Sequence, residues 1–202
     1  MPVHFDNIGK VILDAWNDPR RGHIEPDSRK NENWQRSRNW VDALAKQFRK
    51  RYSPERHRVF WSKNEDNQQE FGLNELLFDI AVCSVSTTKS LEHHSKDLLF
   101  VSRCHWQIES EFSLQNTRDL VVDMSKLVMG TADNKLFVAS HRGDREADIL
   151  EQCAPIAGCC VGTAYFCFIS HPEDWHRNRE RVPTLHEWVG GGWAEVDLPS
   201  AG

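Results

Sequence analysis

Several signals that often decide the class of a protein are missing from this chain of 202 residues. No stretch approaches the roughly 18 uninterrupted apolar residues of a membrane-spanning helix. The first residues also lack the basic-then-apolar pattern of a secretory signal. We therefore expect a cytoplasmic protein that has no membrane partner.

Motifs of two large enzyme classes are missing as well. No Gly-x-Ser-x-Gly pattern occurs, although that pattern carries the nucleophile of many serine hydrolases. The run Gly190, Gly191 and Gly192 is not followed by Lys and then Ser or Thr, as a phosphate-binding P-loop requires. We therefore expect neither serine hydrolase chemistry nor nucleotide binding by a P-loop.

The six cysteines include no Cys-x-x-Cys pair, and no second pair of ligands stands at the spacing of a zinc site. Cys83, Cys104 and Cys167 lie inside apolar, strand-like runs, where a thiol packs as a small apolar group. Reduced, structural thiols are the expected state.

The chain does contain enough apolar residues for one domain. They make up 39% of the sequence and include eight Trp and ten Phe, which suffices for a core at this length. We divide the chain into a loosely packed N-terminal arm (1–32), an α/β core (33–171) and a C-terminal extension of irregular structure packed on the core (172–202).

Hydrophobic periodicity predicts the order helix, strand, strand, strand, helix, strand, and then a further helix and strand. This order indicates a mixed central sheet flanked by helices, and the polar run 63–70 is expected to be a surface loop. The expected helices cover 5–16, 33–52, 113–129 and 144–153. The expected strands cover 57–62, 76–85, 98–112, 135–140 and 163–170.

Carboxylates fall on two consecutive predicted strands. Asp79 is embedded in an apolar run, where an acid needs a partner. Glu109 and Glu111 are two residues apart and so share one face of a strand, and Glu75 shares a face with Asp79 if that strand begins early enough. Oxygen ligands that repel one another favour a hard cation, so we expect these four acids to bind Mg²⁺ or Mn²⁺.

With these acids in this order of elements, the region 33–140 resembles the PD-(D/E)xK nuclease superfamily, which includes many restriction endonucleases. The resemblance implies a restriction-endonuclease-like fold and metal-dependent hydrolysis of phosphodiester bonds. Asp79 resembles the first motif acid of the family and Glu109 the second, while Glu75 resembles an extra acid that some members carry upstream. Glu111 stands where most members have Lys, and some restriction enzymes tolerate an acid at that place as a metal ligand.

Lys126 lies on the predicted helix after these strands, and in this superfamily the motif Lys sometimes migrates to that helix. We therefore name Asp79, Glu109, Glu111 and Lys126 as catalytic candidates. Two simpler interpretations stay open. Glu109 and Glu111 can form the solvent-exposed face of an edge strand, and Lys126 can form a plain surface ion pair with Asp123, three residues away.

The net charge of −5 hides a basic segment. Between Arg29 and Arg58, ten Lys or Arg stand against three Asp or Glu, a local charge of +7, and Trp34, Trp40 and Phe48 lie among them. Such a mixture suits a phosphate-facing surface, although a solvated helix face explains it too. The residues chosen as nucleic-acid contacts are Arg36, Lys46, Arg49, Lys50 and Arg56.

The expected function is thus a magnesium-dependent nuclease acting on DNA or, less favoured, on RNA, with a homodimer or a protein partner as further possibilities. One alternative is a catalytically inactive nuclease fold that binds nucleic acid or proteins as a subunit. Another is a protein-interaction domain that docks a partner through its surface tryptophans.

Overall fold

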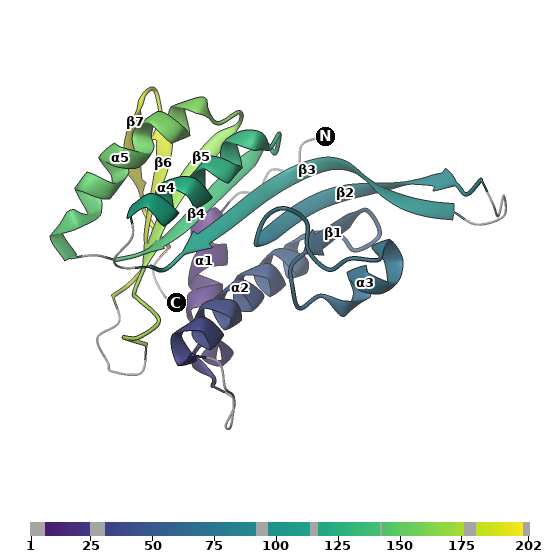
Figure 1. The fold of residues 1–202 in the computed structure, drawn as a ribbon, viewed down its shortest axis with the longest axis horizontal. Coiled ribbons are helices and arrows are strands. Elements are labelled where there is room, and N and C mark those ends of the chain that lie inside the picture. Colours follow the sequence, from purple (N-terminus) through teal and green to yellow (C-terminus); the bar gives the residue numbers. More distant parts are fainter. Residues whose placement is uncertain are drawn as a thin grey trace.

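The computed structural model describes residues 7–24, 31–91, 97–113, 117–141, 143–175 and 181–199. Seven strands form one sheet in which each strand lies beside its neighbours in the chain (Figure 1). The central strands β3, β4 and β5 are parallel, and all the other pairings are antiparallel. The strands are β1 (His57–Phe60), β2 (Ile80–Lys89), β3 (Asp97–Glu111), β4 (Asn134–Ser140), β5 (Thr163–Ile169), β6 (Thr184–Val189) and β7 (Gly192–Val196).

Helices lie on both faces of this sheet. Helices α1 and α2 lie on one face, and α4 and α5 lie on the other (Figure 1). The α-helices are α1 (Ile8–Trp16), α2 (Glu32–Arg51), α3 (Glu65–Phe71), α4 (Thr117–Lys126) and α5 (Glu146–Cys159), and the short 3-10 helices are η1 (Pro19–Gly22), η2 (Leu127–Met129) and η3 (Gly143–Arg145). The protein is therefore an α/β domain with a mixed sheet, as the order of patterns predicted.

Helix α2 matches the predicted helix 33–52 closely, and its ends explain why. The Asn31 side chain accepts a hydrogen bond from the backbone N–H of Asn33 at the start of the helix. Glu32 lies in the first turn, and Arg49, Lys50 and Arg51 lie in the last turn, so charges at both ends complement the helix dipole.

The core between the sheet and α1 with α2 includes the N-terminal helix, contrary to the prediction of a loosely packed arm. Val11 and Ile12 of α1 have no exposed surface, and neither do Leu44 and Phe48 of α2. The indole ring of Trp16 also packs edge-on against Trp40, with ring centroids 6.3 Å apart. Two turns of helix with a continuous apolar stripe bury enough surface to anchor the N-terminal segment.

The polar run 63–70 is not a loop, because α3 occupies most of it. Glu65 and Asp66 lie in the first turn, where they favour the positive end of the helix dipole. Gly72 ends the helix with a φ of 76°, a conformation that glycine adopts without strain. Charges that were read as loop signals are therefore helix signals.

The C-terminal extension is not irregular either, because β6 and β7 extend the sheet beyond β5. Gly190 and Gly191, with φ values of 60° and 95°, make the turn between them. Trp193 reaches back to the α5 side, where its indole N–H donates to the carbonyl oxygen of Leu150 at 2.9 Å. Apolar and polar residues alternate here only over short segments, and the glycine run between them was read as a flexible turn. The sequence therefore did not predict the hairpin.

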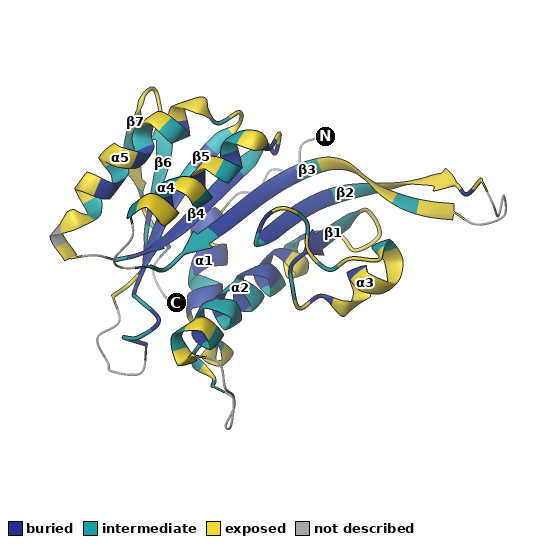
Figure 2. Cartoon of the chain, viewed as in Figure 1, coloured by how far each residue is buried: buried dark blue, intermediate teal, exposed yellow. Residues whose placement is uncertain are grey.

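Two strand positions matter for the candidate sites. Strand β2 begins at Ile80, so Asp79 lies directly before the strand, and the segment from Leu73 to Asp79 is irregular. At its other end, β2 continues with β3 past the edges of β1 and β4 as a projecting two-stranded arm, exposed over most of its length (Figures 1 and 2). None of the helices in the described ranges is both long and apolar enough to cross a membrane.

Candidate acidic site at the ends of β2 and β3

Asp79 and Glu109 come together where β2 begins and β3 ends. Ile80 pairs with Ile108 in the antiparallel register, which places Asp79, one residue before the strand, across from Glu109. The carboxylate of Asp79 accepts a hydrogen bond of 2.9 Å from the backbone N–H of Ser110. The two acids that were matched to the family motif are therefore neighbours, although thirty residues separate them in the chain.

Lys126 joins this pair from the neighbouring helix α4. Its ammonium group lies 3.2 Å from a carboxylate oxygen of Glu109 and 2.7 Å from one of Asp123. Glu109 is only 3% exposed, and β3 lies between β2 and β4 rather than at an edge. The interpretation of Glu109 as part of a solvated strand face is therefore wrong, and the Asp123–Lys126 pair is one half of a larger contact.

Burial sets the ionisation of the two acids. It raises the pKa of Asp79 to about 6, although the Ser110 N–H and the charge of Lys126 oppose this effect. Burial and the neighbouring charge of Asp79 raise the pKa of Glu109 to about 7, against the pull of Lys126. Both carboxyl groups thus exchange protons close to neutral pH, as acids do where their charges crowd together.

Lys126 stays charged in this surrounding. Burial alone lowers the pKa of its ammonium group, but the hydrogen bonds and charges of Asp123 and Glu109 outweigh that effect and raise the pKa above its usual value. Asp123 was not chosen from the sequence as a site residue. Its spacing in the sequence could have identified it, because a carboxylate three residues before a lysine on a helix lies on the same face as that lysine.

Glu111 and Glu75 lie at the margin of the pair. The backbone N–H of Ser113 donates to the Glu111 carboxylate, and burial, together with a hydrogen bond to Asp123, raises the pKa of Glu111. Glu75 is exposed in the irregular segment before β2. The strand does not begin early enough to include it, so Glu75 and Asp79 do not share a strand face.

A hollow of about 360 Å³ opens beside these acids, and Glu75, Asp79 and Glu111 line one part of it. Trp34 and Arg38 of α2 line another part. The guanidinium group of Arg38 lies 5.0 Å from the centre of the Trp34 ring and donates a hydrogen bond to the hydroxyl of Ser62. A cation and an aromatic ring therefore face the acids, although neither side chain was chosen from the sequence.

The donor set suits a hard cation only in part. Among the residues that the structure describes, no three His, Cys, Asp or Glu side chains converge closely enough to hold a metal ion by themselves. Asp79 and Glu109 offer two carboxylates, and protein sites for Mg²⁺ commonly use one or two carboxylates, with water and substrate phosphate as the remaining ligands. The pair therefore fits a cation that is completed by a phosphate substrate.

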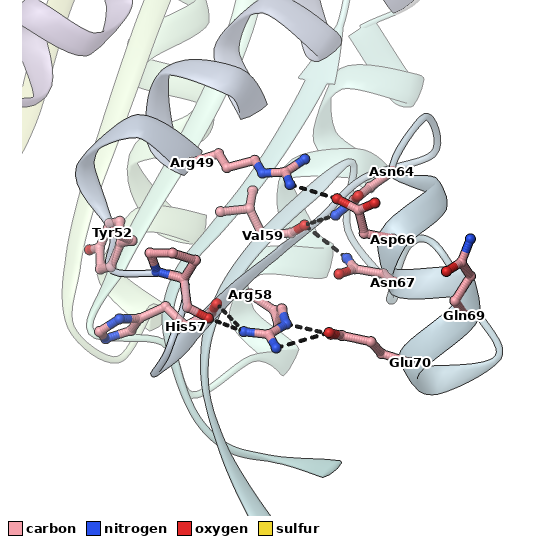
Figure 3. Close-up of a pocket in the computed structure, with 11 residues that line it drawn as sticks. Arg49, Tyr52, His57, Arg58, Val59, Asn64, Asp66, Asn67, Gln69 and Glu70 are labelled. Carbon is pink, nitrogen blue, oxygen red and sulfur yellow. Dashed lines mark hydrogen bonds and ion pairs between the residues drawn. The ribbon is translucent and has the colours of Figure 1, made fainter.

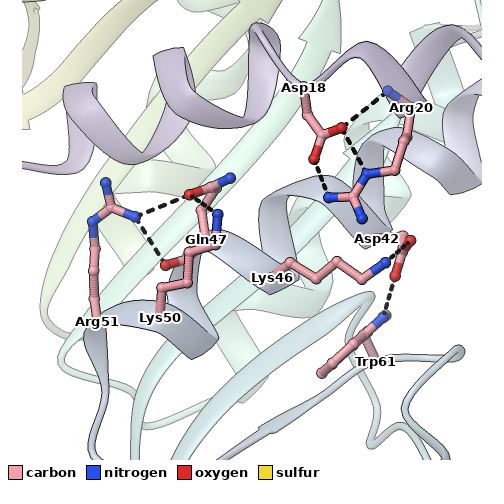
Figure 4. A network of polar contacts seen from close by, with 8 residues as sticks. All are labelled: Asp18, Arg20, Asp42, Lys46, Gln47, Lys50, Arg51 and Trp61. Atoms are coloured by element: carbon pink, nitrogen blue, oxygen red, sulfur yellow. Dashed lines mark hydrogen bonds and ion pairs between the residues drawn. The ribbon is translucent and has the colours of Figure 1, made fainter.

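The predicted nucleic-acid contacts do not form one surface. Arg36 is 4% exposed and pairs with Glu32 at 3.2 Å, so it is not available at the surface. Its place on the buried stripe of α2, four residues before Trp40, is the reason. Lys46 pairs with Asp42 at 2.7 Å, and Asp42 also accepts a hydrogen bond from Trp61 (Figure 4).

Arg49 pairs with Asp66 at 2.6 Å across a second hollow of about 280 Å³, between the end of α2, β1 and α3 (Figure 3). Lys50 lies on the exposed side of α2, with its ammonium group 3.4 Å from the side-chain oxygen of Gln47, and Arg56 is exposed in the turn before β1. Eleven residues of helix, roughly 16 Å, separate Arg38 from Arg49. The predicted contacts that reach the surface thus lie toward the opposite end of α2 from the acidic site.

Comparison with known proteins leaves the family open. No family model matches the chain, and neither the curated proteins nor the solved structures contain a significant match. The residues and their geometry are therefore the basis for assigning a function.

Proposed function

We propose that the protein is a metal-dependent nuclease that hydrolyses phosphodiester bonds, in DNA rather than RNA. One observation supports this function above the others. Asp79 of the segment before β2, Glu109 of β3 and Lys126 of α4 lie together, with Lys126 bonded to Glu109 at 3.2 Å. An acid before one strand, an acid on the next and a lysine from the following helix form the arrangement that the PD-(D/E)xK resemblance predicts.

In this proposal Asp79 and Glu109 hold Mg²⁺ or Mn²⁺. When bound, such an ion lowers the pKa of a coordinated water and stabilises the charge that develops on the phosphate. The backbone N–H of Ser110 donates a hydrogen bond to the carboxylate of Asp79 and so holds it in place. Lys126 orients the attacking water or the phosphate, which the usual motif position cannot do because Glu111 occupies it.

Substrate contacts are proposed on both sides of the acids. Arg38 pairs with a phosphate oxygen of the nucleic acid, and the ring of Trp34, which is 42% exposed, offers a stacking surface beside it. The nucleic-acid backbone is held farther along by Lys46, Arg49 and Lys50 of α2 and by Arg56 of the turn before β1. This arrangement lets a chain with a net negative charge bind a polyanion through local positive groups.

The restriction-endonuclease-like fold belongs to the same proposal. Its support is the order α2, β1, β2, β3, α4, β4, in which three antiparallel strands precede a helix and a strand parallel to β3. Helix α3 and the hairpin of β6 and β7 are additions to that order.

A second candidate is an inactive nuclease fold that binds nucleic acid or a protein. The observation that favours it is the closed contact of Lys126 with both Asp123 and Glu109, which leaves the ammonium group less available to water. In that case the hollow beside Asp79 binds without cleaving.

Nicking of supercoiled plasmid DNA with Mg²⁺ or Mn²⁺ tests the proposal. The intact protein should nick only with the cation, and Asp79→Asn, Glu109→Gln and Lys126→Met should each lower the rate by about 10²-fold or more. Glu151→Gln, which changes an exposed acid on α5, is the matched control and should retain activity. Cation-dependent nicking that survives Asp79→Asn contradicts the proposal, and DNA binding without nicking by the intact protein supports the inactive alternative.

A further inference from the structure

A second polar cluster lies on β2, on β3 and in the turn before β4, away from the acidic site. The hydroxyl oxygen of Ser84 is 2.6 Å from Nε2 of His105, and Nδ1 of His105 is 3.3 Å from a carboxylate oxygen of Asp133. In serine hydrolases the same atoms meet in the same order, with the serine at Nε2 and the acid at Nδ1. The three residues come from distant parts of the chain, so no local sequence motif predicts that they meet.

Irregular pairing between β2 and β3 builds this cluster. Val82 pairs with Trp106 and Cys83 with Cys104, so His105 is the extra residue of a bulge on β3. A second register shift follows Ser84. Bulges turn side chains away from the regular alternation and are frequent beside active sites. Here the bulge lets His105 reach the hydroxyl of Ser84.

Arg103 fixes the acid of the cluster. Its guanidinium group donates two hydrogen bonds to the carboxylate of Asp133, at 2.7 and 3.1 Å. Burial raises the pKa of that carboxyl group, but Arg103 and His105 outweigh the effect and lower it overall. Asp133 is therefore charged at neutral pH and accepts the proton on Nδ1 of His105.

The histidine has the ionisation that a general base needs. Burial and the neighbouring His57 lower the pKa of His105, against the pull of Asp133. His105 is thus neutral at pH 7, and because Nδ1 donates to Asp133, Nε2 accepts the proton of Ser84. The titratable and charged groups that face this ring are Tyr52 from the end of α2, His57 from β1, Arg103 from β3 itself and Asp133 from the turn before β4.

We propose that Ser84 is a nucleophile toward carboxylic esters, a second activity of this protein. Its oxygen attacks the ester carbonyl carbon while its proton passes to Nε2 of His105. The bond from carbon to the alcohol oxygen then breaks, and the alcohol leaves with that proton. Water attacks the acyl-Ser84 by the same route, which releases the carboxylic acid and restores the hydroxyl.

His57 is the side chain placed to stabilise the oxyanion. It pairs directly with Ser84 across β1 and β2, and its ring centroid lies 5.3 Å from that of His105. Nδ1 of His57 lies 3.2 Å from the carbonyl oxygen of Ser53 and so donates to it. Nε2 is then the ring nitrogen of His57 that is not bonded to Ser53, and in this proposal it faces the oxyanion.

The projecting arm indicates the class of ester. Ser86 and Thr88 follow Ser84 at two-residue spacing on β2, and they pair with Phe100 and Leu98. These paired residues share the face of Ser84, because side chains alternate along a strand. Phe100 and Leu98 are 44% and 41% exposed. An ester with an aliphatic acyl chain can lie along them, so short aliphatic esters are the expected substrates.

Labelling with a fluorophosphonate tests the nucleophile in the full chain. Ser84 should be modified, as mapped by mass spectrometry of peptides, and His105→Gln should slow the labelling by about 10²-fold or more. Ser84→Ala should abolish it, whereas Ser86→Ala, on the same face of the same strand, should not. Absence of label on Ser84 in the intact protein overturns the proposal, as does equal labelling in His105→Gln when its thermal unfolding matches the intact protein.

Hydrolysis of p-nitrophenyl acetate and p-nitrophenyl hexanoate tests the substrate class. The hexanoate should be preferred, and Phe100→Ser should remove that preference. Equal rates on both esters in the intact protein, or ester hydrolysis that persists in Ser84→Ala, overturn the assignment. Asp79 lies five residues before Ser84, roughly 16 Å along the strand, so Asp79→Asn should leave this activity unchanged and separates it from the proposed nuclease.

Discussion

Glu109 is a carboxyl group enclosed in the middle of a sheet, with the ammonium group of Lys126 as its ion-pair partner. Its surroundings raise its pKa from the ordinary 4.5 to about 7. The folded protein therefore binds this proton more tightly than the unfolded chain does. Stability from this group is complete below about pH 4.5 and decreases as the pH rises to about 7.

We expect Glu109→Gln to remove part of this pH dependence. An amide does not ionise, so the free energy of unfolding of the variant should fall less between pH 5 and pH 8, by about 1 to 3 kcal/mol. Urea unfolding at several pH values measures this difference. Glu151→Gln, an exposed acid on α5, should follow the intact protein, and parallel curves for Glu109→Gln and the intact protein would refute the expectation.

Lys126→Met should raise the pKa of Glu109 further, because the cation that favours its charged form is removed. Carbon-13 NMR of labelled glutamate side chains measures the titration directly. Lys126→Arg keeps the charge and should leave the pKa of Glu109 within about one unit of the native value. A lower pKa of Glu109 in Lys126→Met would contradict the ion pair between these residues.

At this scale the sequence identifies residues best where a charge stands in an apolar run. Asp79 was found for that reason, whereas Glu109 was found from its two-residue spacing to Glu111 on a predicted strand. It was harder to predict which basic residues of α2 face the solvent. Arg36 and Arg38 are two positions apart, and only the packing of α2 decides which one is buried. The contact of Ser84, His105 and Asp133 depends on a bulge, and alternation of side chains alone predicts no bulge.

At the scale of elements, α1 is part of the core. Ile12 has no exposed surface, so Ile12→Ala should lower the free energy of unfolding by about 2 to 4 kcal/mol through lost burial and the cavity left behind. Chemical denaturation measures the loss. Lys10→Ala, an exposed residue of the same helix, should cost less than about 0.5 kcal/mol, and equal small effects would show that α1 is loosely held.

Segments rich in buried apolar residues were predicted well, and segments with few of them were not. Helices α2 and α4 and strands β3, β4 and β5 agree with their apolar spacing to within a few residues. In α3 only Asn67 is buried, in β6 only Leu185, and no residue of β7 is buried. Their formation depends on caps, on two glycines and on contacts with α5, none of which hydrophobic spacing encodes.

For the whole molecule, the proposed nucleic-acid binding should depend on salt only moderately. Arg49 pairs with Asp66, Lys46 pairs with Asp42, and Arg36 is buried. At most four of the five chosen cations can meet phosphates, so the logarithm of the DNA-binding constant should fall with the logarithm of salt with a slope of about −2 to −4. Fluorescence anisotropy measures it, and a slope steeper than about −6 contradicts this surface.

The order of the strands in the sheet also has a consequence for synthesis. Each strand pairs with the one made just before it. A nascent chain leaving the ribosome can therefore add strands one at a time, and no strand edge stays unpaired until a strand distant in the sequence has been made. The exception is α1, since Trp16 packs on Trp175 with ring centroids 5.9 Å apart. Helix α1 therefore completes this contact only after the segment that holds Trp175 has been made.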